Sequence, residues 1–165
     1  DSSTSRGLGD VYKRQIMYHN WFESKVRYEK TMENGKVKKV AEPYLVDALS
    51  FTEAEARTIE EVTPFISGEF TIMAMKRAAY SETFLFDNGD RFFKCRLAFI
   101  TLDEKSGAER KTKSTMLVQA NDLQQAKDRL VEQMKGTMAD YTIEKVEETD
   151  IVDVYPYATK EVSGK

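Results

Sequence analysis

The sequence has few of the residues on which several common kinds of site depend. Its 165 residues include one cysteine, Cys95, and one histidine, His19. A single cysteine excludes an internal disulfide framework and indicates a reducing compartment. One histidine near the N-terminus and one distant cysteine form neither a metal site nor a Cys–His catalytic pair. We therefore expect no catalytic residue, no metal site, no cofactor and no enzymatic activity.

Long apolar runs and glycine-rich loops are also missing. No apolar run approaches the roughly 20 residues that cross a bilayer, so we expect a cytoplasmic protein with no membrane partner. The eight glycines are scattered, and none opens a helix after a strand as a phosphate-binding loop does. With 25 basic and 28 acidic residues, the formal charge is −3. This balance argues against neutralisation of nucleic-acid phosphates by the whole surface, but it permits a local basic face.

The first fifteen residues do not look like natural protein sequence. Residues 10–15, DVYKRQ, are what the codons GAT GTG TAT AAG AGA CAG encode, and these codons resemble a transposase end used in sequencing libraries. We interpret residues 1–15 as a translated sequencing adapter that is non-native and disordered, and Met17 as the natural start. At the other end, residues 158–165 are predicted to be a loose polar tail.

Residues 16–157 are predicted to form a single pseudo-two-fold domain, with one copy at 20–86 and a second at 91–157. Four separate segments keep one register between the copies, at an offset of 71 (92 − 21) to 72 (116 − 44) residues. The matching segments are 21–28 with 92–99, 44–48 with 116–120, 51–62 with 123–134, and 70–72 with 141–143. A repeat of this length predicts that the two copies have the same local structure.

Each copy reads as strand, strand, helix, strand. The first strand alternates apolar and polar residues with a period of two, and Asn34-Gly35 and Ser106-Gly107 supply hairpin turns. Capping residues at Ser50 and Asp122 begin the helices. We predict an α+β fold with one mainly antiparallel sheet of about six strands and two helices on one face. In this arrangement the third strand of copy one turns back into the first strand of copy two.

The outer face of the two first strands holds the candidate binding residues. Aromatic and basic side chains alternate there, and such a surface can stack bases and neutralise phosphates. The residues are Trp21, Lys25, Arg27, Phe92, Lys94 and Arg96. The alternative is that the two aromatic side chains are covered by another element or protomer and that the cations protect sheet edges.

The copies also differ in charge at one matching place. The acidic residues 147–150 align with residues 76–79, which begin with Lys76 and Arg77. This difference indicates either a solvated strand end or an ion pair, across the pseudo-axis or between protomers.

Three stretches carry a resemblance to a known family. They are residues 21–35, residues 42–57 and residues 134–141, which includes Met134-Lys135-Gly136-Thr137-Met138. From residue 20 to about residue 157 the chain resembles an uncharacterised domain-of-unknown-function family of anaerobic gut bacteria and related mobile elements. The resemblance implies a small bacterial protein, chromosomal or from a phage or mobile element. It implies no activity, cofactor or catalytic residue.

Three hypotheses about function follow. The first is a non-enzymatic binding or assembly module, with a protein partner or a second copy of the chain. The second is single-stranded nucleic-acid binding on the aromatic and basic face. The third is a small-ligand binder or enzyme with a cleft between the repeats.

Overall fold

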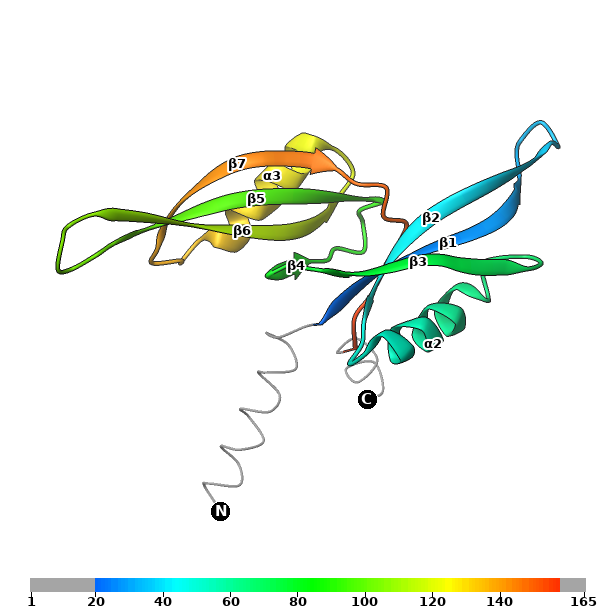
Figure 1. Ribbon diagram of the computed structural model, residues 1–165. Coiled ribbons are helices and arrows are strands. Elements are labelled where there is room, and N and C mark those ends of the chain that lie inside the picture. The colour runs from blue at the N-terminus through cyan, green and yellow to red at the C-terminus, as the bar shows by residue number, and fades with distance from the viewer. Residues whose placement is uncertain (1–19, 158–165) are drawn as a thin grey trace, which may run out of the picture. The chain divides into compact units, whose positions relative to one another are not determined.

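The computed structural model describes residues 20–157. Four predictions fall outside the described residues: the interpretation of residues 1–15 as an adapter, Met17 as the natural start, His19, and the loose tail at 158–165. The elements are β1 (Trp21–Thr31), β2 (Val37–Asp47), α2 (Phe51–Val62), β3 (Phe70–Ala78), β4 (Glu82–Phe84), β5 (Arg91–Leu102), β6 (Glu109–Ala120), α3 (Leu123–Met134), β7 (Asp140–Glu148) and β8 (Val154–Tyr155) (Figure 1).

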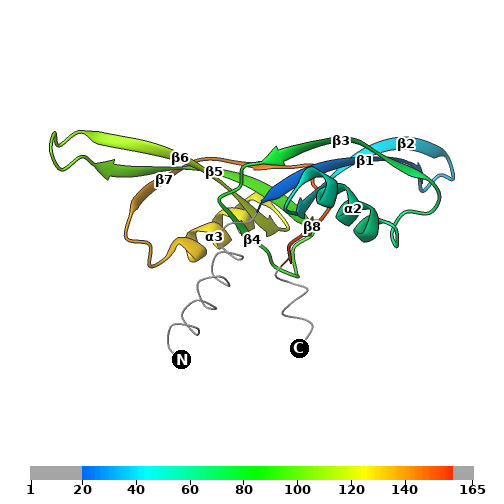
Figure 2. The same ribbon diagram turned by 60° about the horizontal axis from the view of Figure 1, so that its bottom comes forward.

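The strands form two separate four-stranded sheets, in the orders β3-β1-β2-β8 and β4-β6-β5-β7. The chain correspondingly divides into two compact units. In the described part, the first unit comprises residues 20–78 and 151–157, and the second comprises residues 79–150. The α+β class with two helices is confirmed, but the single six-stranded antiparallel sheet is wrong. Each sheet has its own helix, α2 in the first unit and α3 in the second (Figure 2).

Two short strands explain why each sheet is mixed rather than antiparallel. The expected long third strands, 69–84 and 141–155, are each interrupted, at 79–81 and at 149–153. After the first break β4 pairs in parallel with β6, and after the second break β8 pairs in parallel with β2. Strands of two and three residues are too short to show a hydrophobic period, so the sequence pattern did not predict them. The turn at 86–89 joins β4 to β5, but these strands are not neighbours in the sheet because β6 lies between them. The turn therefore does not form the expected hairpin.

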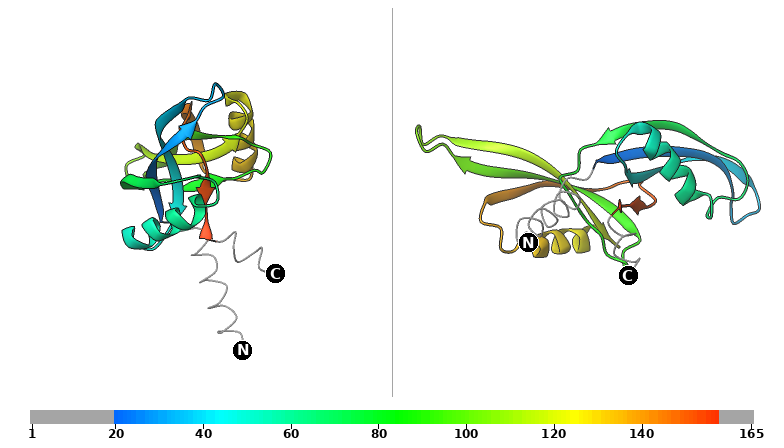
Figure 3. Two further views of the ribbon diagram at one scale, coloured as in Figure 1. Left: turned by 90° about the vertical axis from the view of Figure 1, so that its right-hand side faces the viewer. Right: turned by 90° about the horizontal axis from the view of Figure 1, so that it is seen from below.

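The hairpins follow the sequence prediction. Gly35 and Gly107 have φ angles of 82° and 72°, a left-handed conformation that glycine adopts without steric cost. The β5–β6 hairpin runs past the end of β7, since β5 continues to Leu102 while its pairing with β7 stops at Ile100 (Figure 3). β1 likewise continues to Thr31, beyond its last pairing with β3 at Tyr28.

Each third strand contains an irregularity at the same place. Between Lys25 and Val26 of β1, the paired residue of β3 changes from Ala74 to Ile72, which leaves Met73 as the extra residue. In the second unit the pairing of β5 with β7 skips Glu144 in the same way. Such β-bulges are common in edge strands and redirect a side chain.

Both predicted helix starts are confirmed. Ser50 and Asp122 are the N-caps, and each side chain accepts a hydrogen bond from the backbone N–H three residues later, at 3.2 Å and 2.8 Å. Reciprocally, the side-chain oxygens of Glu53 and Gln125 accept hydrogen bonds from the backbone N–H of the residue before each cap, at 3.3 Å and 2.7 Å. These bonds satisfy backbone donors that have no partner inside a helix.

The buried cores differ in chemistry between the units. In the second unit, β5, β6 and α3 contribute a continuous apolar cluster that includes Phe93, Cys95 and Leu130. In the first unit, two fully buried hydroxyls, Ser24 and Thr58, occupy the positions that match Cys95 and Leu130. Both units contain the order strand, strand, helix, strand, but the short strand follows it in the first unit and precedes it in the second. The duplication itself stays a prediction. Within residues 20–157, neither helix is long and apolar enough to cross a membrane.

Candidate functional site

The six predicted site residues lie on two strands, three on β1 and three on β5. Of the two alternatives for Trp21 and Phe92, the structure supports the covered one, because each residue is only 2% exposed. The alternation of residues correctly places both rings on the outer face of their strands. The alternation cannot show that this face is buried at the N-terminal end of each strand and exposed to solvent nearer its C-terminal end. Neither ring is therefore available to stack on a base.

The four cations have different environments. Lys25 and Arg27 on β1 and Arg96 on β5 are exposed, and Lys94 is half-buried. Lys25 and Arg27 belong to the first unit and Lys94 and Arg96 to the second, so each pair is described within its own sheet.

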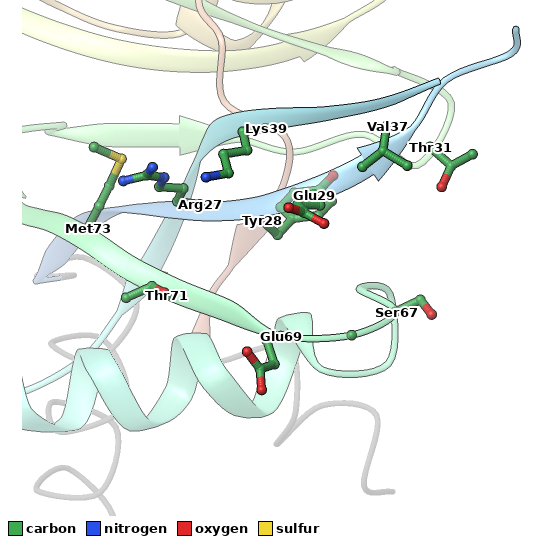
Figure 4. A pocket seen from close by; sticks show the side chains of 11 residues that line it. Arg27, Tyr28, Glu29, Thr31, Val37, Lys39, Ser67, Glu69, Thr71 and Met73 are labelled. Atoms are coloured by element: carbon green, nitrogen blue, oxygen red, sulfur yellow. The ribbon is translucent and has the colours of Figure 1, made fainter. Parts of the chain in front are cut away.

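In the first unit, the exposed cations border a hollow on the outer face of the sheet. The hollow has a volume of about 660 Å³, and its lining includes Arg27, Lys39, Thr71 and Met73. Arg27 and Lys39 project from neighbouring strands with their charged ends close together, and Met73 lies beside Arg27 (Figure 4). Lys39 was not among the predicted site residues. We call Lys25, Arg27, Lys39 and Met73 the cationic face.

The cations of this face have no neutralising partner. Among the described residues, Lys25, Arg27 and Lys39 take part in no ion pair within 4 Å. Glu29 lies opposite Lys39 in the strand register but does not reach it. The lining of the hollow contains two cations, Arg27 and Lys39, and two carboxylates, Glu29 and Glu69. With Lys25 the local charge is +1, and the unpaired cationic side chains are open to an incoming anion.

On the matching face of the second unit, one cation is paired with a carboxylate, whereas Arg96 and Lys111 take part in no ion pair within 4 Å among the described residues. Lys113 donates to both carboxylate oxygens of Glu144 at 2.6 Å. This bond, together with the charges of Lys113, Lys111 and Arg96, lowers the pKa of the Glu144 carboxyl. Glu144 occupies the bulge that Met73 occupies in the first unit. The repeat offset of 71 residues already aligned the two positions, so this signal was available in the sequence.

The single cysteine is in a structural position. Cys95 is fully buried in the core of the second unit, and burial raises the pKa of its thiol to about 11. An activated cysteine needs a lowered pKa, so this environment opposes nucleophilic chemistry. Within residues 20–157, no group of three or more His, Cys, Asp or Glu residues could hold a metal ion.

The first unit also contains a cluster of tyrosines and carboxylates. The hydroxyl of Tyr28 donates to Glu42 at 2.6 Å, and the Tyr44 and Tyr155 rings stack with centroids 6.2 Å apart. Burial raises the pKa of all three tyrosines, that of Tyr44 to about 12. These groups stay protonated at neutral pH, and the Tyr28 hydroxyl acts as a hydrogen-bond donor. The corresponding residues of the second unit, Phe99, Met116 and Phe84, lack hydroxyls.

Arg57 and Arg129 hold matching segments in the two units. Arg57 donates to the carbonyl oxygens of Asp47 and Tyr155 and lies over the Tyr157 ring, 4.5 Å from its centroid. Arg129 lies 4.4 Å from the centroid of the Phe86 ring and donates to Gln119 at 2.8 Å. Both arginines therefore serve the fold, by fixing the segments that lead into β5 and follow β8.

The comparisons with known proteins identify a family. Residues 20–157 match the family model described as Domain of unknown function (DUF4494). Neither a curated protein nor a solved structure matches the chain significantly. Because the match covers most of the sequence, the chain belongs to this family of unknown function, DUF4494.

Proposed function

We propose that this protein is a non-enzymatic binding module and that the cationic face of the first unit binds the phosphate backbone of a nucleic acid. One observation supports this proposal above the others. The first unit leaves Lys25, Arg27 and Lys39 without ion pairs among the described residues, whereas on the matching face of the second unit Glu144 pairs with Lys113. Cations that lie close together on a protein surface favour the binding of a nucleic acid, because they replace counterions condensed on its phosphates and release them into solution.

The neighbouring hairpin extends the same charge. Between residues 29 and 39, four lysines outnumber two glutamates, which gives a net charge of +2. The matching hairpin, residues 101–111, has three basic and three acidic residues and no net charge. Lys30 and Lys38 lie directly opposite each other across β1 and β2, and Lys30 is 3.7 Å from Glu42. Because successive residues of a strand point to opposite faces, these two lysines lie on the other face of the sheet from Lys39, and the hairpin carries lysines on both faces.

The burial of the aromatic rings restricts how binding would occur. With Trp21 and Phe92 inaccessible, base stacking contributes nothing on these faces. Contacts to phosphates position a protein on a nucleic acid but do not read its sequence. We therefore expect binding that tolerates any sequence and weakens steeply with salt. Single strands are one form of this ligand, and duplexes are another.

The proposal also includes the origin and setting of the protein. Both units contain the order strand, strand, helix, strand. We interpret this shared order as the result of a tandem duplication, after which the first copy kept the exposed cations of the cationic face. A cytoplasmic location in a bacterium, on a chromosome or mobile element, fits the free Cys95 and the proposed ligand. The small-ligand cleft between the repeats stays a prediction.

The test is a fluorescence-anisotropy titration of residues 17–165 with labelled mixed-sequence DNA, single-stranded and duplex, at two salt concentrations. The variant Lys25→Gln/Lys39→Gln removes two charges from the cationic face. Its matched control is Arg96→Gln/Lys111→Gln, because these positions correspond in the second unit. We expect the first variant to lower the salt slope by about 2, roughly 1 for each lost phosphate contact. We expect the control to bind like the unmodified protein.

Two results would overturn the proposal. Flat anisotropy at low salt, where electrostatic binding is strongest, would exclude nucleic acid as the ligand. Equal losses in the two variants would show that the charge of the whole protein, and not the cationic face, governs binding.

A further inference from the structure

The edge strands β3 and β7 have net charges of opposite sign. β3 is the edge of the first sheet and has two basic residues, Lys76 and Arg77, with no acidic residue. β7 is the edge of the second sheet and has four carboxylates and one lysine. Each strand has nine residues and is hydrogen-bonded on one side only, to β1 or to β5. Among the described residues, no backbone group of either strand bonds to anything else.

We infer that copies of this chain associate head to tail, with β3 of one copy beside β7 of the next. An unpaired strand edge is a template for another strand, because its free N–H and C=O groups can extend the ladder. The net charges of the two strands determine which pairing is favourable. β3 beside β3 would place +2 against +2, and β7 beside β7 would place −3 against −3. Only the unlike pair brings opposite charges together.

The bulges define which part of each edge can pair. Met73 and Glu144 interrupt the two strands, so the regular segments are Ala74–Ala78 in β3 and Lys145–Glu148 in β7. The β3 segment contains Lys76 and Arg77, and the β7 segment contains Lys145, Glu147 and Glu148. Glu147 pairs with Lys145 at 3.2 Å and Glu148 with Arg91 at 3.5 Å, and all four of these side chains are exposed. The Lys76 side chain is 73% exposed, and its intramolecular partner Glu23 is 3.6 Å away. A long exposed pair of this kind is weak and leaves Lys76 free to bind a second carboxylate.

Apolar surface next to β3 adds to the contact. Phe51 and Met73 are 48% and 50% exposed, and they line a groove of about 300 Å³ between α2 and β3. A neighbouring copy at this edge would cover the groove. Four or five paired residues bury a small area, so the association belongs to the weak class of interfaces. A head-to-tail contact uses two different surfaces and therefore produces open chains or closed rings of copies.

The experiment is analytical ultracentrifugation from about 10 to about 500 µM at low salt, a range chosen for weak interfaces. The unmodified protein is compared with Lys76→Glu, with Glu147→Lys and with an equimolar mixture of the two. We expect the average mass of the unmodified protein to rise with concentration, and each variant alone to associate about five- to tenfold more weakly. The mixture should associate again, because each variant then meets an edge of opposite charge.

The mixture separates the proposal from simple damage to the fold, since a misfolded variant cannot be rescued by another misfolded variant. A monomeric unmodified protein throughout this range would overturn the inference. Variants that associate as well as the unmodified protein, or a mixture that does not recover, would also overturn it.

Discussion

The buried hydroxyl pair of the first unit offers a sharp test of how its core is held together. Ser24 and Thr58 are both fully buried, and their oxygens are 2.9 Å apart. Thr58 Oγ1 is also 2.7 Å from the carbonyl oxygen of Ala54. A threonine has one hydroxyl proton, so Thr58 donates to Ala54 and accepts the proton of Ser24. Ser24 thus depends on Thr58, whereas Thr58 has a second partner.

This dependence predicts unequal and non-additive costs. Thr58→Val keeps the shape of the side chain but strands the buried Ser24 hydroxyl, which costs about 1–3 kcal/mol of unfolding free energy. Ser24→Ala removes the donor and leaves Thr58 bonded to Ala54, so we expect a cost of about 1 kcal/mol. In the double variant no donor is stranded. Its cost should fall below the sum of the single costs by about 1 kcal/mol.

Urea unfolding at 25 °C, followed by far-UV circular dichroism, measures all four proteins. The comparison requires a common m value, because a changed slope would indicate a change in the denatured state or in cooperativity. Additive costs, within about 0.3–0.5 kcal/mol, would refute the coupling of the two hydroxyls. A Thr58→Val variant as stable as the unmodified protein would show that Ser24 finds another partner.

Two further predictions concern backbone space and pH. Gly89→Ala should lower stability by about 1–3 kcal/mol in urea unfolding, because the added Cβ would lie 2.7 Å from the backbone nitrogen of Ala120; an unchanged midpoint would contradict this contact. Burial raises the pKa of the Asp153 carboxyl against the hydrogen bond from the Val154 N–H, and the charge of Glu61 adds to the rise. A raised pKa means that the folded state binds the proton more tightly, so this group stabilises the fold at low pH and loses that effect as pH rises through its folded pKa. Asp153→Asn should therefore raise the melting temperature at pH 7 and lose this advantage below the ordinary pKa of aspartate; an equal gain at both pH values would contradict the assignment.

Local features of the fold were predictable because short-range chemistry determines them. Ser50 and Asp122 can satisfy helix donors without help from distant residues, and the structure places helix starts there. Gly35 and Gly107 likewise allow the turns of two hairpins. The pairing of β4 and β8 depends on contacts far apart in the chain, and it converts one expected sheet into two.

The candidate site shows the same division between local and distant information. The period of two placed Lys25, Arg27 and Trp21 on one face of β1 correctly. It could not show which part of that face is covered, so whether Trp21 is exposed stayed open until the structure showed it buried. Lys39 was missed because its place beside Arg27 depends on the register of β1 with β2.

Comparison of matching residues in the two units helps to separate those that stabilise the fold from those proposed to bind a ligand. Residues that keep a fold stable are expected to be similar in both, as Arg57 and Arg129 are. Residues that serve a ligand have no reason to be repeated. At the bulge, Glu144 pairs with Lys113 in the second unit, and the matching residue of the first unit is Met73. Met73 lines both the hollow beside Arg27 and the groove between α2 and β3, so one position borders both proposed surfaces.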